Sequence, residues 1–105
     1  MYEYMTVGVD GVKLTNGKKR RQAVLAEICR RDPENENTDI WLEDIGTDGE
    51  PAYAVFADSE RVGEIREEDI PEVSKRWAKY DTVILFSIWG SPGDYGLEIK
   101  IRFRR

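Results

Sequence analysis

The sequence has no histidine, a single cysteine and no long apolar segment. Without histidine it lacks the commonest general base at neutral pH, and without a cysteine pair it has no thiolate zinc site. A lone Cys29 excludes an intramolecular disulfide, and its apolar neighbours indicate a small hydrophobe rather than a reactive thiol. The run Val83–Phe86 is far too short to span a membrane and no signal peptide is visible, so we expect a cytoplasmic protein.

Other signatures of catalysis are also missing. Gly17-Lys18-Lys19 lacks the first glycine and the Ser/Thr of a P-loop, so nucleotide hydrolysis has no support. The segment Asp44–Gly49 resembles a calcium-binding loop at only three positions, and an acidic turn is the preferred interpretation. The carboxylates of Glu67–Asp69 lie at a predicted helix start, where capping explains them. The sequence therefore predicts a protein that is not an enzyme, with no cofactor and no metal site.

Composition indicates one folded domain. The chain has 105 residues, of which 40% are hydrophobic and 10% aromatic, enough for a single modest core. No repeat, low-complexity segment or linker divides it, so we expect one domain over residues 1–105.

Charge is unevenly distributed along the chain, whose net charge is −5. Residues 1–31 carry seven Lys or Arg and three Asp or Glu, whereas residues 32–60 carry ten acidic residues and no basic ones. This asymmetry predicts a basic and an acidic patch, or alternatively two solvated faces without a ligand. The overall acidity argues against strong non-specific binding to duplex nucleic acid.

Hydrophobic periodicity predicts a mainly β, α+β fold in the order β-α-β-β-β-α-β-β. Helices are expected over residues 18–31 and from Asp69 onward, where Asp69 and Glu72 have the spacing of a capping box. Strands are expected near residues 5–9, 38–45, 51–57, 61–65, 83–89 and 97–103. The segment Val83–Trp89 is apolar at nearly every position, which predicts a central strand covered on both faces. A small antiparallel barrel carrying two helices satisfies this pattern.

The most informative segment is Asn16–Gln22. With Asn16 as the N-cap of the helix 18–31, the cations Lys18, Lys19, Arg20 and Arg21 fall at a helix start, where free N–H groups favour an anion. The segment therefore predicts a phosphate-binding site. The alternative is that these residues are solvated and balanced by the acidic region that follows.

Two further features bear on binding. Trp41 alternates with Ile40 and Leu42 and therefore points away from the core, where it would form a stacking platform for a base unless a helix or loop covers it. Tyr53 and Tyr95 are weaker candidates for the same role. A second cationic row lies on one face of the last strand and is interpreted as a charged outer face or a protected sheet edge; it comprises Lys100, Arg102, Arg104 and the adjacent Arg105.

The order and spacing of several short motifs resemble the HIRAN domain, over most of the chain. They are Val7–Val9, Asn16-Gly17 with Arg21-Gln22, Ala52–Phe56 with Arg61–Ile65, and Ile70–Val73. The resemblance implies an OB-like antiparallel β-barrel and recognition of DNA, particularly of single-stranded 3′ ends. The segment Glu43–Ala52 departs from the family pattern, since the Asn and Tyr residues of the end-binding pocket are replaced by carboxylates and glycines.

Two hypotheses follow. The first is a nucleic-acid-binding module for single-stranded DNA or DNA ends, with contacts from Asn16, Lys18, Lys19, Arg20, Arg21, Trp41 and Tyr53. The second is a protein-interaction or regulatory domain in which the acidic surface of residues 32–60 binds a basic partner and DNA binding has been lost. No membrane partner is expected, and the sequence leaves the oligomeric state open.

Overall fold

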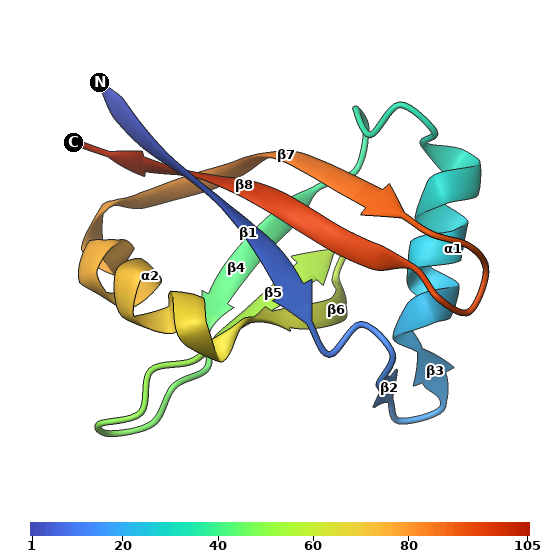
Figure 1. The fold of residues 1–105 in the computed structure, drawn as a ribbon, viewed down its shortest axis with the longest axis horizontal. Helices are drawn as coiled ribbons and strands as arrows, with labels where there is room; N and C mark the ends of the chain where they lie inside the picture. The colour runs from blue at the N-terminus through green and yellow to red at the C-terminus, as the bar shows by residue number, and fades with distance from the viewer.

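The computed structural model describes residues 1–105 and shows a mainly β fold with two helices (Figure 1). Six strands form one antiparallel sheet in the order β4-β5-β6-β1-β8-β7. These strands are β1 (Tyr2–Asp10), β4 (Ile40–Asp44), β5 (Tyr53–Ala57), β6 (Glu60–Ile65), β7 (Tyr80–Trp89) and β8 (Gly96–Arg104). The helices are α1 (Arg21–Arg31) and α2 (Ile70–Arg76), the latter between 3-10 turns at Glu67–Asp69 and Trp77–Lys79. A separate hairpin pairs β2 (Thr15–Asn16) with β3 (Lys19–Arg20).

The sheet curls into a nearly closed, OB-like barrel. The long strand β1 pairs with β8 along most of its length and with β6 at its end, where Val9 lies opposite Ile65. Strands β1, β8 and β7 form one side of the barrel, and β4, β5 and β6 form the other (Figure 1). The edge strands β4 and β7 share no ladder, but the Leu42 amide donates a hydrogen bond to the Tyr80 hydroxyl at 3.1 Å.

Alternating apolar residues of both sides fill the barrel. The largest fully buried side chains are Phe103, Leu25, Ile28, Leu97, Ile99, Ile101, Val55, Val62 and Val73. Helix α1 lies at one end of the barrel and α2 at the other (Figure 1), and each buries an apolar stripe there. Burial of each large aliphatic side chain contributes about 1.5–3 kcal/mol to the free energy of unfolding. The predicted order of elements is confirmed, with the β2–β3 hairpin as an addition.

Two local predictions are wrong. Helix α1 begins at Arg21 rather than at residue 18, because Gly17 adopts a φ of 63° and turns the chain into the β2–β3 hairpin. Asn16 is therefore not the N-cap, and Lys18, Lys19 and Arg20 precede the helix. Asp69 likewise makes no side-chain capping bond to α2.

Strand β7 is not a central strand covered on both faces. It ends the sheet, and Leu85 and Trp89 remain 56% and 50% exposed. The reason is that both helices lie over the ends of the barrel, so neither covers the outer face of β7 (Figure 1). No helix in the structure has the length and apolar content that crossing a lipid bilayer requires.

Candidate functional site

Arg21, predicted to contact phosphate, has a structural role. Its side chain is only 5% exposed. The guanidinium donates to the Asn16 Oδ1 at 2.9 Å, to the Gly11 carbonyl at 2.8 Å and to the Glu64 Oε2 at 2.7 Å. Because these acceptors neutralise and orient the group inside the protein, the prediction that Arg21 binds a ligand phosphate is wrong.

The rest of the basic segment is partly committed to the fold as well. The Asn16 Nδ2 donates to the Arg61 carbonyl at 2.7 Å, which anchors the β2–β3 hairpin on β6, so both polar atoms of the Asn16 side chain take part in hydrogen bonds within the fold. Lys19 pairs with Glu60 at 2.8 Å. Lys18 and Arg20 are exposed and form no ion pair. The hairpin therefore presents two unpaired cations instead of the four in a helix start that the sequence predicted.

The two predicted stacking residues differ in their outcome. Tyr53 is only 3% exposed and its ring packs on Trp77 with centroids 4.6 Å apart, so its predicted role as a platform for a base is wrong. It lies on the same side of β5 as the core residue Val55, which explains its burial. Trp41 points away from the core as predicted, but it is half-buried and stacks on Phe56 with centroids 5.7 Å apart.

Trp41 is also in acidic surroundings, because its indole donates to the Glu43 carboxylate at 3.2 Å. An acidic neighbour repels a phosphate backbone, which makes this a poor position for a nucleic-acid contact. The residues predicted from the sequence therefore do not form one site.

A different surface combines aromatic and cationic side chains. On the outer face of the barrel, Tyr2 lies opposite Arg104, Tyr4 opposite Arg102 and Thr6 opposite Lys100. The two tyrosines are 43% and 53% exposed. The Arg102 guanidinium lies 4.4 Å from the Tyr2 ring centroid, and the Lys100 ammonium 5.1 Å from that of Tyr4. These distances are those of cation–π contacts, and we call this surface of β1, β8 and β7 the aromatic-basic face.

Strand β7 extends this face with Leu85, which lies opposite Lys100, and with Trp89, which lies opposite Gly96. A Cβ atom at Gly96 would lie 2.5 Å from the Trp89 ring, so the glycine lets the indole lie on the sheet. A shallow hollow of about 290 Å³ lies on this face over β8, between β1 and β7; its lining includes Thr6, Leu85, Glu98 and Lys100.

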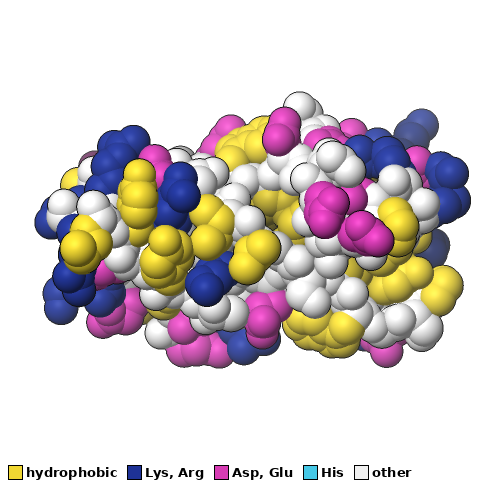
Figure 2. Space-filling model, turned by 90° about the horizontal axis from the view of Figure 1, so that it is seen from above, with side chains coloured by type: hydrophobic (Ala, Val, Ile, Leu, Met, Phe, Trp, Pro, Cys, Tyr) yellow, Lys and Arg dark blue, Asp and Glu magenta, His cyan; other side chains and the backbone are white.

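Cations outnumber carboxylates on the aromatic-basic face, where Lys100, Arg102 and Arg104 lie with Asp81 and the exposed Glu98. Asp81 accepts hydrogen bonds from Arg102 at 2.7 Å and Arg104 at 3.1 Å, and these two guanidinium groups hold the pKa of Asp81 below its usual value. Lys100 has no carboxylate partner, whereas the Arg66 guanidinium, which lies across Gly8, pairs with Asp10 at 3.5 Å. Figure 2 shows Lys and Arg side chains interleaved with hydrophobic ones at the end of the molecule where the termini lie.

A basic cleft of about 470 Å³ adjoins the face through Arg104. Its lining consists of Lys75, Arg76, Lys79, Arg104 and Arg105 with Glu3 and Phe103. Glu3 pairs with Arg76 at 3.2 Å and with Arg105 at 3.4 Å, whereas Lys75 and Lys79 have no partner. The cleft is therefore suited to an anionic group such as a phosphate.

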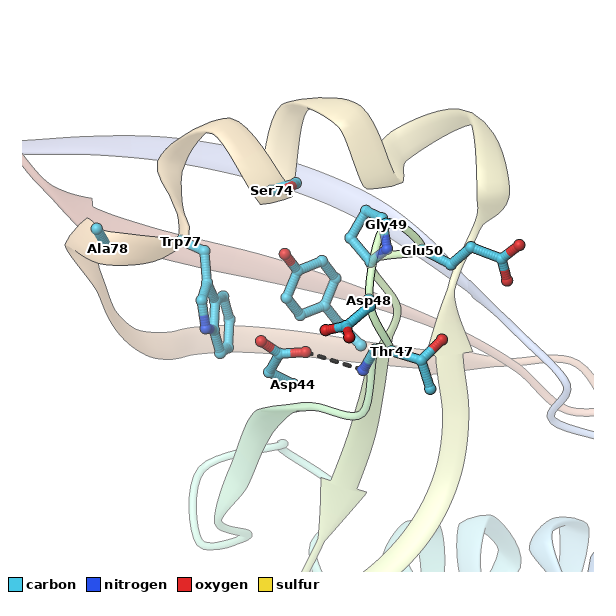
Figure 3. A pocket seen from close by; sticks show the side chains of 11 residues that line it. Asp44, Thr47, Asp48, Gly49, Glu50, Ser74, Trp77 and Ala78 are labelled. Carbon is cyan, nitrogen blue, oxygen red and sulfur yellow. Dashed lines mark hydrogen bonds between the residues drawn. The ribbon is translucent and has the colours of Figure 1, made fainter.

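A second cleft, of about 590 Å³, has the opposite character. It lies between the β4–β5 loop and the C-terminal end of α2, and its lining includes Asp44, Asp48, Glu50, Tyr53 and Trp77 (Figure 3). No Lys or Arg lines it. No group of three or more Asp, Glu or Cys side chains in the structure is arranged to hold a metal ion.

Comparison with known proteins identifies no relative: no protein-family model, curated protein or solved structure matches this chain. The functional interpretation therefore depends on the surfaces described above. Sequence reasoning missed Tyr2 and Tyr4, although their alternation with Glu3 and Met5 is the signal of a strand with an aromatic outer face.

Proposed function

We propose that this protein is a non-enzymatic module that binds single-stranded nucleic acid, DNA foremost, on the aromatic-basic face. The observation that carries the proposal is the placement of two exposed tyrosines, Tyr2 and Tyr4, among the cations of β8. A sheet surface with exposed aromatic rings and interleaved Lys or Arg is a common solution for binding unpaired bases and their phosphates.

Stacking supplies the first part of the interaction. Tyr2 and Tyr4 are two residues apart on one strand, so their Cα atoms are separated by about 6.5–7 Å, and both rings project from the same face. Base–aromatic stacking contributes about 1–3 kcal/mol per base and tolerates any sequence, because every base has a π face. Trp89, half-exposed on β7, offers a further ring toward the other end of the face, because it lies opposite Gly96 whereas Tyr4 lies opposite Arg102.

Phosphate contacts supply the second part. Lys100 and Arg104 lie beside the tyrosines, and the basic cleft continues the positive surface past Arg104. Acidic residues dominate elsewhere, since the chain has a net charge of −5. A strand of nucleic acid would be repelled from the acidic loop and attracted to this end of the molecule, so binding should weaken as salt screens the phosphates.

The resemblance to the HIRAN domain favours the same ligand class, because that family is associated with single-stranded DNA ends. The fold is compatible with this proposal, but fold alone does not identify a ligand. Lys18 and Arg20 of the hairpin remain a second candidate for phosphate contacts, and the experiment must separate the two surfaces.

The test is fluorescence anisotropy of a short fluorescein-labelled single-stranded DNA titrated with the protein at low salt. The variant Lys100→Gln/Arg104→Gln removes two positive charges from the aromatic-basic face, and Lys18→Gln/Arg20→Gln removes two from the hairpin. We expect the first variant to lose about tenfold in affinity and the second to stay within about twofold of the wild type. The reverse ranking would transfer the site to the hairpin, and no saturable binding by the wild type would refute the proposal.

A further inference from the structure

The edge of β7 over residues 85–89 has no strand beside it. β7 pairs only with β8, and no hydrogen bond outside this ladder uses a main-chain group of residues 85–89. In an antiparallel edge strand, every second residue directs both its N–H and its C=O away from the sheet. The segment therefore presents main-chain donors and acceptors that water or another strand must satisfy.

The usual protections of a sheet edge are absent from this segment. Residues 82–89 include no charged residue and no proline. The register with β8 shifts between Tyr80 and Thr82 and again between Val83 and Leu85, so bulges distort the first half of β7. Residues 85–89 pair regularly with β8 and leave a straight edge, which is the form that accepts a further strand.

The opposite edge of the sheet is protected. Strand β4 ends in the exposed carboxylates of Glu43 and Asp44, which would repel their counterparts in a second copy. The Leu42 amide of β4 already donates to the Tyr80 hydroxyl. Of the two edges, β7 is therefore the one that a further strand can join.

The side chains of β7 are apolar but incompletely covered. None of its ten residues is fully buried. Leu85 and Trp89 are 56% and 50% exposed on the outer face, and Phe86 and Ile88 pack against the core while remaining partly exposed. A strand added beside β7 would remove apolar surface from water on both faces of the sheet.

The sequence of this segment is complementary to itself. When two antiparallel copies are aligned about a two-fold axis at Ser87, Leu85 of each copy lies opposite Trp89 of the other, and Phe86 lies opposite Ile88. Directly opposite residues share one face of an antiparallel sheet, so the exposed pair meets on the outer face and the core-facing pair on the inner face. Each apolar side chain gains an apolar neighbour, which selects a second copy of this chain as the partner.

Charge does not oppose this pairing, although each copy has a net charge of −5. The carboxylates that flank the segment in the sequence are Asp81 and Asp94. Asp81 pairs with Arg102 and Arg104, and Asp94 pairs with Lys13. Two copies can therefore approach along β7 without unpaired like charges facing each other.

We propose that the protein forms a symmetric dimer in which residues 85–89 of β7 pair antiparallel with the same residues of a second copy, with Ser87 at the two-fold axis. The axis is perpendicular to the sheet, so both outer faces lie on the same side and Tyr2 and Tyr4 stay uncovered. One short strand pair is a small interface, for which we expect a Kd on the order of 1–100 µM. The dimer does not depend on nucleic acid and is measured without it.

The test is sedimentation velocity on the protein alone from about 1 µM to about 200 µM. We expect the weight-average mass to rise reversibly with concentration, from that of the monomer toward twice that value. Ser87→Lys places two ammonium groups opposite each other at the axis and should weaken the dimer about tenfold or more. Thr15→Lys, which adds the same charge at an exposed position of β2, should dimerise like the wild type. A wild type that stays monomeric throughout, or a dimer that Ser87→Lys leaves intact, would overturn the proposal.

Cysteine crosslinking tests the register without an added charge. In a Cys29→Ala background, Ser87→Cys places two thiols opposite each other with Cα atoms about 4.5–5.5 Å apart, a separation that a disulfide spans. Leu85→Cys is the matched control in the same strand, because its two copies lie about 13 Å apart along the strands. Mild oxidation should convert most of Ser87→Cys and little of Leu85→Cys into a covalent dimer. Equal yields from the two variants, or no covalent dimer from Ser87→Cys, would refute the pairing about Ser87.

Discussion

The Leu42 amide on β4 donates a hydrogen bond to the Tyr80 hydroxyl on β7, with 3.1 Å between nitrogen and oxygen. These strands are the two edges of the sheet and share no backbone ladder. The Tyr80 ring stacks on Trp77 with ring centroids 4.7 Å apart and contacts Phe103 edge-on with centroids 6.5 Å apart. The Tyr80 side chain therefore links the two edge strands where no backbone hydrogen bonds join them. It also gives the Leu42 amide a hydrogen-bond acceptor on an otherwise open sheet edge.

Replacement of Tyr80 by phenylalanine should destabilise the protein while preserving the aromatic packing. The Leu42 amide would lose its acceptor in a half-buried position, at a cost of about 1 kcal/mol in the free energy of unfolding. For a domain of this size that corresponds to a fall in Tm of about 4–8 °C. Thermal unfolding followed by circular dichroism measures it. Tyr95→Phe is the matched control, because the Tyr95 hydroxyl makes no hydrogen bond; equal effects of the two variants would contradict the closing role of Tyr80.

Tyr80 should also give the protein a specific sensitivity to alkali. Burial raises the pKa of the Tyr80 hydroxyl and the nearby Asp81 charge adds to the effect, against the opposing hydrogen bond from Leu42. The folded state thus retains the neutral phenol at a pH where the unfolded chain, with a pKa of about 10, ionises. The stabilisation is present below that value and is lost as the pH rises through the raised pKa. Urea midpoints between neutral pH and the alkaline range should fall more steeply for the wild type than for Tyr80→Phe.

Asp32 should account for part of the stability at neutral pH. This buried carboxylate at the end of α1 accepts hydrogen bonds from the Glu36 and Asn37 amides, at 2.9 and 3.0 Å, and from the Thr38 hydroxyl at 2.7 Å. Burial by itself raises the pKa of Asp32, but these three donors outweigh it and the pKa is lowered. The stabilisation is therefore present above the unfolded pKa of about 3.9 and is lost as the pH falls through the lower folded value.

Asp32→Asn places an amide opposite these donors and should cost about 1–3 kcal/mol at neutral pH, with the difference from wild type shrinking in acid. Thermal unfolding at a series of pH values measures both effects. Asp39→Asn, which alters an exposed carboxylate seven residues after Asp32, should leave the curve unchanged. A pH-independent difference between Asp32→Asn and the wild type would show that the hydrogen bonds do not depend on the charge.

Arg21→Met should destabilise the protein without impairing its binding surfaces. The substitution keeps an aliphatic side chain but removes the donors to Gly11, Asn16 and Glu64. The partly buried Glu64 carboxylate is then left with Arg61 as its one ion-pair partner. Breaking a buried pair on one side costs about 3–5 kcal/mol when burial is complete, so somewhat less is expected here. Urea denaturation measures this loss of stability, and Arg20→Met, a substitution at the exposed neighbouring position, is the control. Unchanged stability with loss of oligonucleotide binding would restore Arg21 as a phosphate contact.

The surroundings of Arg21 also show which features of the structure can be predicted from the sequence and which cannot. The order of strands and helices followed from alternation and helical stripes, because local burial patterns reflect local geometry. The sequence marked Arg21 as unusual, yet its partner Glu64 is 43 residues away and is brought to it only by the packing of α1 on β6. The glycine turn at Gly17 competed with helix formation over the same segment, and the pattern of charges alone could not decide between them.

The exposed face of β7 illustrates a second limit. A continuous apolar run predicts burial on both sides, but exposure depends on where the helices lie, and here they lie over the barrel ends. The aromatic-basic face depends in addition on the register between β1 and β8, which places Tyr2 and Tyr4 opposite Arg104 and Arg102. Pairing of chain ends about a hundred residues apart is not encoded in any short window.

Removal of the two tyrosine rings should separate stacking from charge in the proposed nucleic-acid contact. Tyr2→Ala/Tyr4→Ala leaves Lys100, Arg102 and Arg104 in place, so the dependence of the logarithm of affinity on the logarithm of salt should keep its slope. The affinity itself should fall at every salt concentration, by about tenfold or more, because stacking is lost. Lys100→Gln/Arg104→Gln should instead reduce the slope by about 1–2, since fewer counterions are released. Anisotropy titrations over a range of salt measure both quantities. Parallel losses of slope and affinity in the two variants would contradict a surface in which rings bind bases and cations bind phosphates.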